Sequence, residues 1–273
     1  MAIICISRGT LSGGEAVAER VAERLGCPCL SRERNLATVA TRYQITPEVL
    51  TATLDKRPSF WEKVLGERDL YLLCVRATLL DQAKSGQLVY HGYLGQFLLP
   101  GVSPVLRVRL IAEPALRARA AMEQRQLAEA EALAYLDRVD QKRRDWTRFL
   151  FGVDWEDPTL YDIVLNLSRL PVEAAADTVV GLTKQPEFQL DSLQAIEDQA
   201  LRHRVLAALA LDYRTRGADL EVTAQDGTVT IIGTTHWQEV LEAVPLVVRD
   251  IAGVQDVRTE ITGVKPLHPL NFY

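Results

Sequence analysis

Short apolar runs alternate with helical patterns over the first two thirds of the chain. The runs have the length and composition of buried strands and lie at residues 2–6, 87–90, 105–111 and 161–165. The helix predicted after the first run carries Val17, Val21 and Leu25 on one face and ends at Gly26. Further helical patterns occupy residues 35–83, 114–151 (with a break) and 172–182. Strands separated by helices predict an α/β fold, in which helices flank a parallel sheet.

The pattern changes near residue 183. The polar residues 184–192, with one proline, predict a linker. The elements predicted after it are a helix over 193–214, a hairpin around Asp226 and Gly227, a helix over 236–250 and a final strand. The predicted organisation is a domain over 1–183, a small α+β domain over 193–264 and a tail over 265–273.

Composition restricts the class of protein. The 273 residues carry a net charge of -5, which disfavours non-specific nucleic-acid binding. The chain has no uncharged apolar stretch of about 18 residues and its start lacks the pattern of a secretion signal, so we expect a cytoplasmic protein without a transmembrane segment. The four cysteines and four histidines lack metal-ligand spacing, so we expect reduced thiols and no metal site.

A glycine-containing loop lies between the first predicted strand and its helix, where many nucleotide-binding proteins hold a phosphate. Its glycines allow backbone amides to point inward, and they are Gly9, Gly13 and Gly14. A P-loop also needs a lysine and a hydroxyl, but these positions are Glu15 and Ala16 in one register. The other register places Gly14 at the lysine. Arg8 is then the only cation of the loop.

A second interpretation needs no ligand. Ser12 and Glu15 have the spacing of a capping box, in which each side chain bonds the backbone amide of the other residue. Glu15 also places a negative charge at the positive end of the helix. The residues alone therefore leave two functions open for Arg8 and Ser12: phosphate binding, or the start of a capped helix.

The opening CISRGTLSGGEAVAERVAERLGCPCLSRE resembles that of the cytidylate kinase-like family. The stretch VDQKRRDWTRFLFGVDWEDPTLYDIVLNLSRL, residues 139–170, resembles the same family more specifically. The resemblance covers about residues 1–183. It implies a P-loop nucleoside monophosphate kinase fold that uses ATP and Mg²⁺ to phosphorylate a nucleotide such as CMP.

A basic cluster in the second stretch suits phosphoryl oxygens, and it comprises Lys142, Arg143, Arg144 and Arg148. Arg144 and Arg148 lie one helical turn apart, so they share a face. In monophosphate kinases such a segment is the lid over ATP, and the resemblance therefore makes the three arginines catalytic candidates. It also makes Asp157 and Asp162 candidates for positioning Mg²⁺ or nucleotide. The alternative is a solvated basic face balanced by Asp137, Asp140 and Asp145.

Two departures from the family pattern affect the expected activity. Relatives often have arginine after the second loop glycine, where this chain has Glu15. Relatives also have an arginine that holds the monophosphate where this chain has Tyr93. We therefore expect nucleotide binding with weak or absent kinase turnover. An active kinase for CMP-type monophosphates is the alternative.

The stretch DGTVTIIGTTHWQEVLEAVPLVVRDIAGVQDVRTEI resembles a BON domain. The matching turn positions include Gly227, Gly233 and Gly253. The resemblance implies a phospholipid or small ligand as partner. The alternative is a regulatory or oligomerising appendage, which would make the protein a homo-oligomer.

Overall fold

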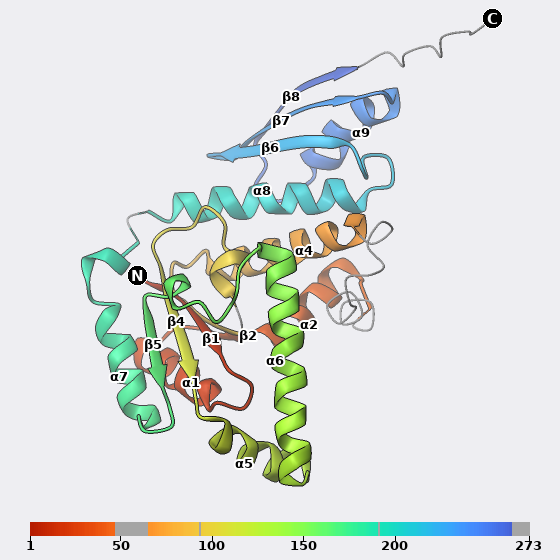
Figure 1. Cartoon of the computed structure of the whole chain (residues 1–273). Coiled ribbons are helices and arrows are strands. Elements are labelled where there is room, and N and C mark those ends of the chain that lie inside the picture. The colour runs from red at the N-terminus through yellow and green to blue at the C-terminus, as the bar shows by residue number, and fades with distance from the viewer. Residues whose placement is uncertain (47–64, 93, 191, 264–273) are drawn as a thin grey trace, which may run out of the picture. The chain divides into compact units, whose positions relative to one another are not determined.

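The computed structural model describes residues 1–46, 65–92, 94–190 and 192–263 (Figure 1). The chain forms two compact units. Residues 1–57 and 82–193 make the first unit, and residues 58–81 and 194–273 make the second. Each unit is described separately below.

The first unit contains a five-stranded sheet in the order β2-β3-β1-β4-β5. Every neighbouring pair is parallel. The strands are β1 (Ile3–Arg8), β2 (Cys29–Ser31), β3 (Leu88–Gly92), β4 (Val105–Ile111) and β5 (Ile163–Asn166). Its α-helices are α1 (Gly14–Leu25), α2 (Arg32–Tyr43), α5 (Pro114–Arg125), α6 (Glu129–Phe151) and α7 (Val172–Leu182). Short 3-10 turns are η2 (Gly95–Leu98), η3 (Pro158–Leu160) and η4 (Pro186–Phe188). This architecture confirms the predicted α/β class.

The two faces of this sheet differ in character. Ile4, Ile6 and Leu110 pack in one core with the apolar sides of α1 and α7. On the opposite face, Ser7 and Arg109 are register neighbours on β1 and β4. That face therefore carries polar side chains in its interior, next to the carboxyl ends of the strands.

Sequence patterns locate most elements of the first unit. The predicted strand 105–111 and helix 172–182 match β4 and α7. The expected break in the long helical pattern falls between α5 and α6, where Gln126 has a positive φ of 54°. Strand β2 was not predicted, because it has only three residues and none is fully buried.

The second unit contains a three-stranded sheet in the order β6-β7-β8. Its elements are α4 (Leu65–Ala83), α8 (Gln194–Leu211), β6 (Asp219–Gln225), β7 (Thr228–Thr235), α9 (Gln238–Arg249) and β8 (Asp256–Gly263). The predicted hairpin is confirmed, with φ of 49° at Asp226 and 79° at Gly227 in the turn. Strand β8 then pairs parallel to β7. Side chains of α8 and α9 cover one face of the sheet.

Helix α4 falls inside the predicted first domain but groups with the second compact unit up to residue 81. A half-buried ion pair joins Asp81 of α4 to Arg204 of α8, with 3.6 Å between the charged groups. The pairing is between residues far apart in sequence, which explains why a linear pattern does not reveal it. None of the helices in the described parts of the chain is long and apolar enough to cross a membrane.

Candidate functional site

The glycine loop occupies residues 9–13, between β1 and α1, at the carboxyl edge of the parallel sheet. The Gly9 amide donates to the Leu110 carbonyl over 3.0 Å, and the Ser12 amide donates to the Gly9 carbonyl over 3.2 Å. Leu11 and Gly13 both have positive φ, 56° and 79°. The loop thus turns sharply and presents the amino end of α1, whose first amides lack helical partners and attract anions.

The predicted capping box does not form. Gly13, not Ser12, is the N-cap of α1, and no side chain caps the helix there. The left-handed conformation of Gly13 moves the helix start one residue beyond the position that the capping box requires. Ser12 is only 2% exposed, and its hydroxyl has no hydrogen-bond partner in the described part of the chain. A buried hydroxyl without a partner is costly, so the Ser12 hydroxyl lacks a partner that the described residues do not supply.

Gly14 makes room for Arg8. A Cβ atom on residue 14 would lie 2.7 Å from the Cβ of Arg8 and 3.2 Å from Cδ1 of Leu110. Any side chain at this position, lysine included, would therefore collide with Arg8. In this loop a cation, Arg8, packs its Cβ atom beside the backbone of Gly14.

Arg8 extends from the end of β1 toward β3 and α2. Its Nε donates to Nδ1 of His91 over 3.2 Å, and its guanidinium lies 3.6 Å from the Glu33 carboxylate. Burial, and then the charge of Arg8, hold the pKa of His91 below its usual range. Arg8 is therefore a fixed cation beside the loop.

Helices α5 and α6 hold the other side of the loop. The Thr10 hydroxyl donates to Asp140 of α6 over 2.9 Å, and Arg117 of α5 donates to the Thr10 carbonyl over 2.8 Å. Arg117 and Asp140 also pair with each other. Leu11 packs against the apolar cluster between the two helices. The sequence did not single out Arg117, and it offered Asp140 only as a balancing charge.

The structure separates the predicted lid cations into two groups. Arg143 reaches the loop, where it donates to the Arg8 carbonyl over 3.3 Å. Arg144 and Arg148 instead pair with the turn after α6, at 3.6 Å from Glu156 and 2.6 Å from Asp154. Lys142 is exposed on α6.

The two candidate carboxylates have other contacts. Asp157 caps η3 and accepts hydrogen bonds from the amide and hydroxyl of Thr159, which lower its pKa. Asp162 pairs with Arg107 at the amino end of β5, level with the middle of β1. The structure thus does not bring Asp162 to the loop. Tyr93, expected to replace a phosphate-binding arginine, lies outside the described residues.

The described residues offer no site made of protein side chains alone for the Mg²⁺ ion that the resemblance implies. They include no group of three or more His, Cys, Asp or Glu side chains arranged to hold a metal. Ala16 offers no hydroxyl at the position where a P-loop binds the ion. Phosphate binding at this site would therefore depend on the loop amides, Ser12 and the arginines.

Arg109 is a functional candidate that the sequence analysis missed. It is nearly buried, donates to the Trp155 carbonyl and lies 3.8 Å from Glu156. Its guanidinium also stacks 4.6 Å from the Trp155 ring centroid. The alternation of apolar and basic residues in 105–111 was the available signal, because it places arginines on one sheet face. Arg109 fixes the turn that holds Arg144.

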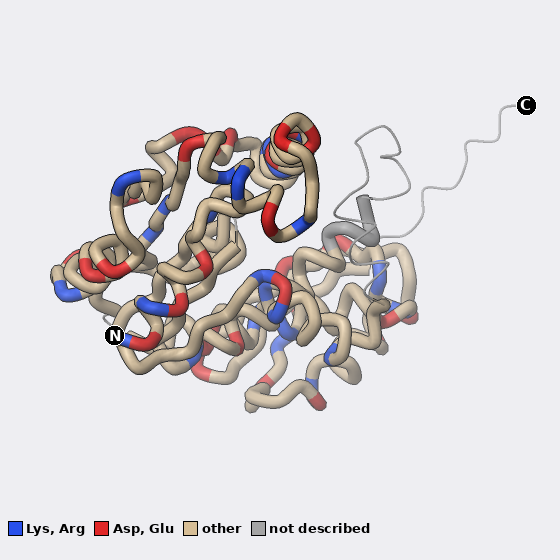
Figure 2. The backbone as a smooth tube through the Cα atoms, turned by 90° about the horizontal axis from the view of Figure 1, so that it is seen from below, with Lys and Arg blue, Asp and Glu red and all other residues tan. Residues whose placement is uncertain are grey.

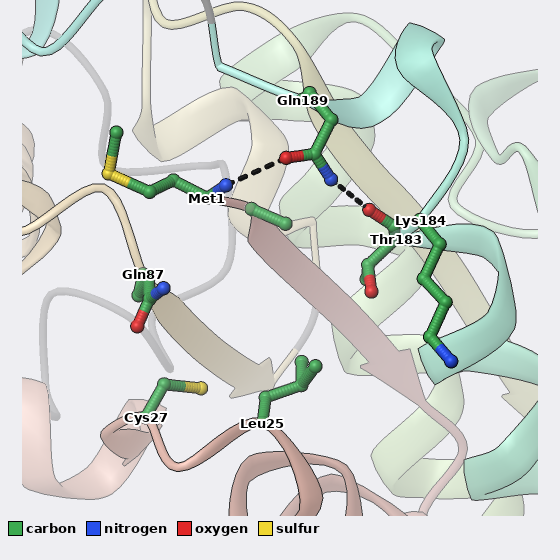
Figure 3. Close-up of a pocket in the computed structure, with 8 residues that line it drawn as sticks. Met1, Leu25, Cys27, Gln87, Thr183, Lys184 and Gln189 are labelled. Carbon is green, nitrogen blue, oxygen red and sulfur yellow. Dashed lines mark hydrogen bonds between the residues drawn. The ribbon is translucent and has the colours of Figure 1, made fainter.

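Two of the cavities among the described residues share Cys27 in their linings. A cavity of about 290 Å³ beside the loop is lined by α1, by the end of α2 near Ser31 and Arg34, and by His91. A smaller one, about 160 Å³, lies at the amino ends of β1 and β3 (Figure 3). There Gln189 joins the amino group of Met1 to the Thr183 carbonyl. The larger of these two cavities lies next to the candidate site, because its lining includes Glu15, which follows Gly14, and His91, which contacts Arg8.

Acidic and basic positions are interspersed along the chain (Figure 2). In the first unit, each arginine of the candidate site faces a carboxylate: Arg8 with Glu33, Arg143 with Asp140, Arg144 with Glu156 and Arg148 with Asp154. The site is therefore nearly neutral without a ligand, and a phosphate must compete with these carboxylates.

The predicted glycine positions of the second unit serve its backbone. Gly227 and Gly253 have positive φ of 79° and 95°. A Cβ on Gly233 would lie 2.4 Å from the Asp219 carbonyl oxygen on the paired strand. These glycines shape the hairpin and the turn before β8, and their contacts indicate no ligand.

Comparisons with known proteins agree with this architecture. The model of the "Cytidylate kinase-like family" matches residues 3–169, and the model of the "BON domain" matches residues 197–265. A crystal structure of an uncharacterized protein from Eubacterium ventriosum is similar, with a TM-score of 0.52 and 19% identity, over 67% of this chain and 98% of that chain. At that identity the likeness shows the fold. No match was found among curated proteins.

Proposed function

The chain belongs to the cytidylate kinase-like family and carries a BON domain, and from this premise we propose that its first unit binds a nucleotide through residues 8–14 with weak or absent phosphoryl transfer. The observation that carries the proposal is the Ser12 hydroxyl, which is buried beside the amino end of α1 and has no hydrogen-bond partner among the described residues. A phosphate oxygen there would accept from Ser12 and from the helix amides. Arg8 supplies the adjacent charge.

Weak turnover follows from the charges of the site. Phosphoryl transfer needs cations that stay beside the phosphoryl group as it moves. A lysine at residue 14 cannot supply such a charge, because its Cβ would collide with Arg8. The arginines are paired with carboxylates, and each ion pair contributes up to about 1 kcal/mol to stability when it is exposed. A phosphate must break these contacts before it gains its own. We therefore expect binding that is measurable but weaker than in a kinase with free lid cations.

The second candidate function is an active kinase for CMP-type monophosphates. One observation favours it: Arg143 of α6 bonds the backbone of Arg8, so the predicted lid already contacts the loop. The arginines Arg144 and Arg148 would then exchange Glu156 and Asp154 for the phosphates of ATP.

For the second unit we propose a ligand-binding or regulatory function. Helices α8 and α9 cover one face of its sheet, whereas Thr223, Thr230 and Ile232 lie on the other face and are wholly or partly exposed. A small ligand, a phospholipid headgroup or a second copy of the chain are the candidate partners of this face. Because nucleotide binding requires a nucleotide pool, we also propose a cytoplasmic location.

Calorimetric titration of the full chain tests the proposal. ATP should bind with a Kd between about 10 μM and 1 mM, in titrations made with Mg²⁺ and again with EDTA. CMP should be titrated next. Ser12→Ala should weaken ATP binding several-fold, whereas Ser168→Ala, which removes a hydroxyl bonded to the Glu113 amide, should not.

Two outcomes would contradict this function. Absence of heat with millimolar ATP and with CMP would show that the loop is only a helix start. Rapid, Mg²⁺-dependent formation of CDP from ATP and CMP would favour the active kinase.

A further inference from the structure

The contact between Arg8 and His91 requires a particular state of the imidazole. An arginine guanidinium only donates hydrogen bonds, so Nδ1 of His91 must carry a lone pair. The ring is therefore neutral, with its proton on Nε2. His91 is 3% exposed and lies near the end of β3.

Arg8 is restrained from three directions. The backbone of Gly14 packs against its Cβ, His91 accepts from its Nε, and Glu33 lies near its outer nitrogen at 3.6 Å. The Arg8 side chain is 18% exposed, whereas that of Glu33 is 64% exposed. The buried contacts to Gly14 and His91 thus fix Arg8, and the exposed contact to Glu33 is the one that a ligand can replace.

The charges around His91 keep it neutral near pH 7. Burial lowers its pKa most, followed by Arg8, and Arg34 of α2 acts in the same direction. Glu15 of α1 and Glu33 of α2 act in the opposite direction and are weaker. Arg8 and His91 therefore stabilise each other: the cation keeps the ring neutral, and the neutral ring accepts the cation's Nε–H.

We propose that His91 is a positioning residue that holds Arg8 beside the loop so that its outer nitrogens, released from Glu33, bind a phosphoryl group. This inference rests on the proposed nucleotide function. It identifies His91 as the residue that fixes the position of Arg8, the cation that would act where a P-loop has its lysine. An unrestrained arginine loses side-chain freedom when it binds, which weakens affinity by roughly two- to tenfold. His91 removes that loss because Arg8 is already ordered.

The test compares two substitutions of the same residue in the full chain. His91→Asn keeps an acceptor oxygen near the Nδ1 position, and His91→Leu keeps the volume but has no acceptor. Kd values are measured by calorimetry for ATP, CMP and inorganic phosphate. We expect His91→Leu to weaken binding by about fivefold to tenfold and His91→Asn to stay within twofold of wild type. A merely structural role of His91 would not show rescue by asparagine.

The three probes identify the source of the phosphoryl group. If His91→Leu loses affinity for ATP alone, Arg8 binds the triphosphate, and if it loses affinity for CMP alone, Arg8 binds the monophosphate. A loss of affinity for all three probes assigns Arg8 to a position that they share. Unchanged affinity for every probe in His91→Leu would overturn the inference while leaving nucleotide binding intact. If wild type binds none of the probes, the proposed function fails and the inference fails with it.

A measurement without ligand tests the pair itself. Nitrogen-15 NMR of wild type at pH 7 should show His91 with an unprotonated Nδ1, and Arg8→Met should raise the pKa of His91. A protonated Nδ1 in wild type, or a pKa unchanged by Arg8→Met, would overturn the inference whatever the titrations give.

Discussion

Substitution of Gly14 tests the steric argument that connects the loop to Arg8. A Cβ on residue 14 would lie 2.7 Å from the Arg8 Cβ, which is about 0.8–1.3 Å closer than an ordinary carbon–carbon contact of about 3.5–4.0 Å. Overpacking of this kind costs about 1–3 kcal/mol. Alanine's better helix propensity returns at most about 1 kcal/mol. Gly14→Ala should therefore lower the free energy of unfolding by about 1–2 kcal/mol.

Differential scanning calorimetry measures this effect. A loss of 1 kcal/mol shifts the midpoint of a unit of this size by about 2–4 °C, so we expect a decrease of about 2–8 °C. Gly181→Ala is the matched control, because a Cβ there has no atom within 4 Å and the helix α7 should gain slightly. Gly14→Lys should be destabilised at least as much and gain no kinase activity. An unchanged midpoint in Gly14→Ala, or kinase activity in Gly14→Lys, would refute the reasoning.

Three further predictions concern the charges. Arg144→Ala should weaken ATP binding by about threefold to tenfold with little change in thermal stability. The control Arg138→Ala, on the same helix, should change neither the affinity nor the stability. Equal calorimetric affinities of Arg144→Ala and wild type for ATP would remove Arg144 from the site. Glu15→Gln should tighten ATP binding about twofold at low salt and not at high salt, since it removes a negative charge from the loop; salt-independent tightening would speak against an electrostatic cause. Burial lowers the pKa of His203 to about 4, so the unfolded chain binds a proton that the folded chain excludes. The free energy of unfolding should then fall by up to ~3 kcal/mol as the pH decreases from 6.5 toward 4, and urea denaturation of His203→Gln should show a flatter profile.

Local patterns were sufficient for the sheet but not for the chemistry of its edge. Strand β4 and helix α7 were predictable because buried positions recur with the period of each element. The start of α1 was not, because the positive φ of Gly13 displaces the cap by one residue and leaves Ser12 buried. A sequence motif specifies spacing and does not specify the conformation of a single glycine.

The contacts that define the site join distant residues. Arg8 and His91 are separated by 83 positions, and Thr10 and Asp140 by 130. The sequence identified Arg8 as a cation and His91 as one of four histidines without metal-ligand spacing. The two residues meet only because β1 and β3 are parallel neighbours in the sheet, which places the carboxyl ends of both strands side by side. The role of the loop glycines in binding a phosphate stays a prediction.

The grouping of α4 with the second unit has a consequence for how the chain is made. Its buried residues include Cys74, Ala77 and Leu80, and its Asp81 pairs with Arg204. About 110 residues separate the end of α4 from the start of α8. At synthesis rates of about 5–20 residues per second, α4 leaves the ribosome roughly 6–20 s before its partner helix exists. During that interval the apolar side chains of α4 lack the rest of the second unit and Asp81 lacks Arg204, so newly made chains should be transient clients of the cell's chaperones.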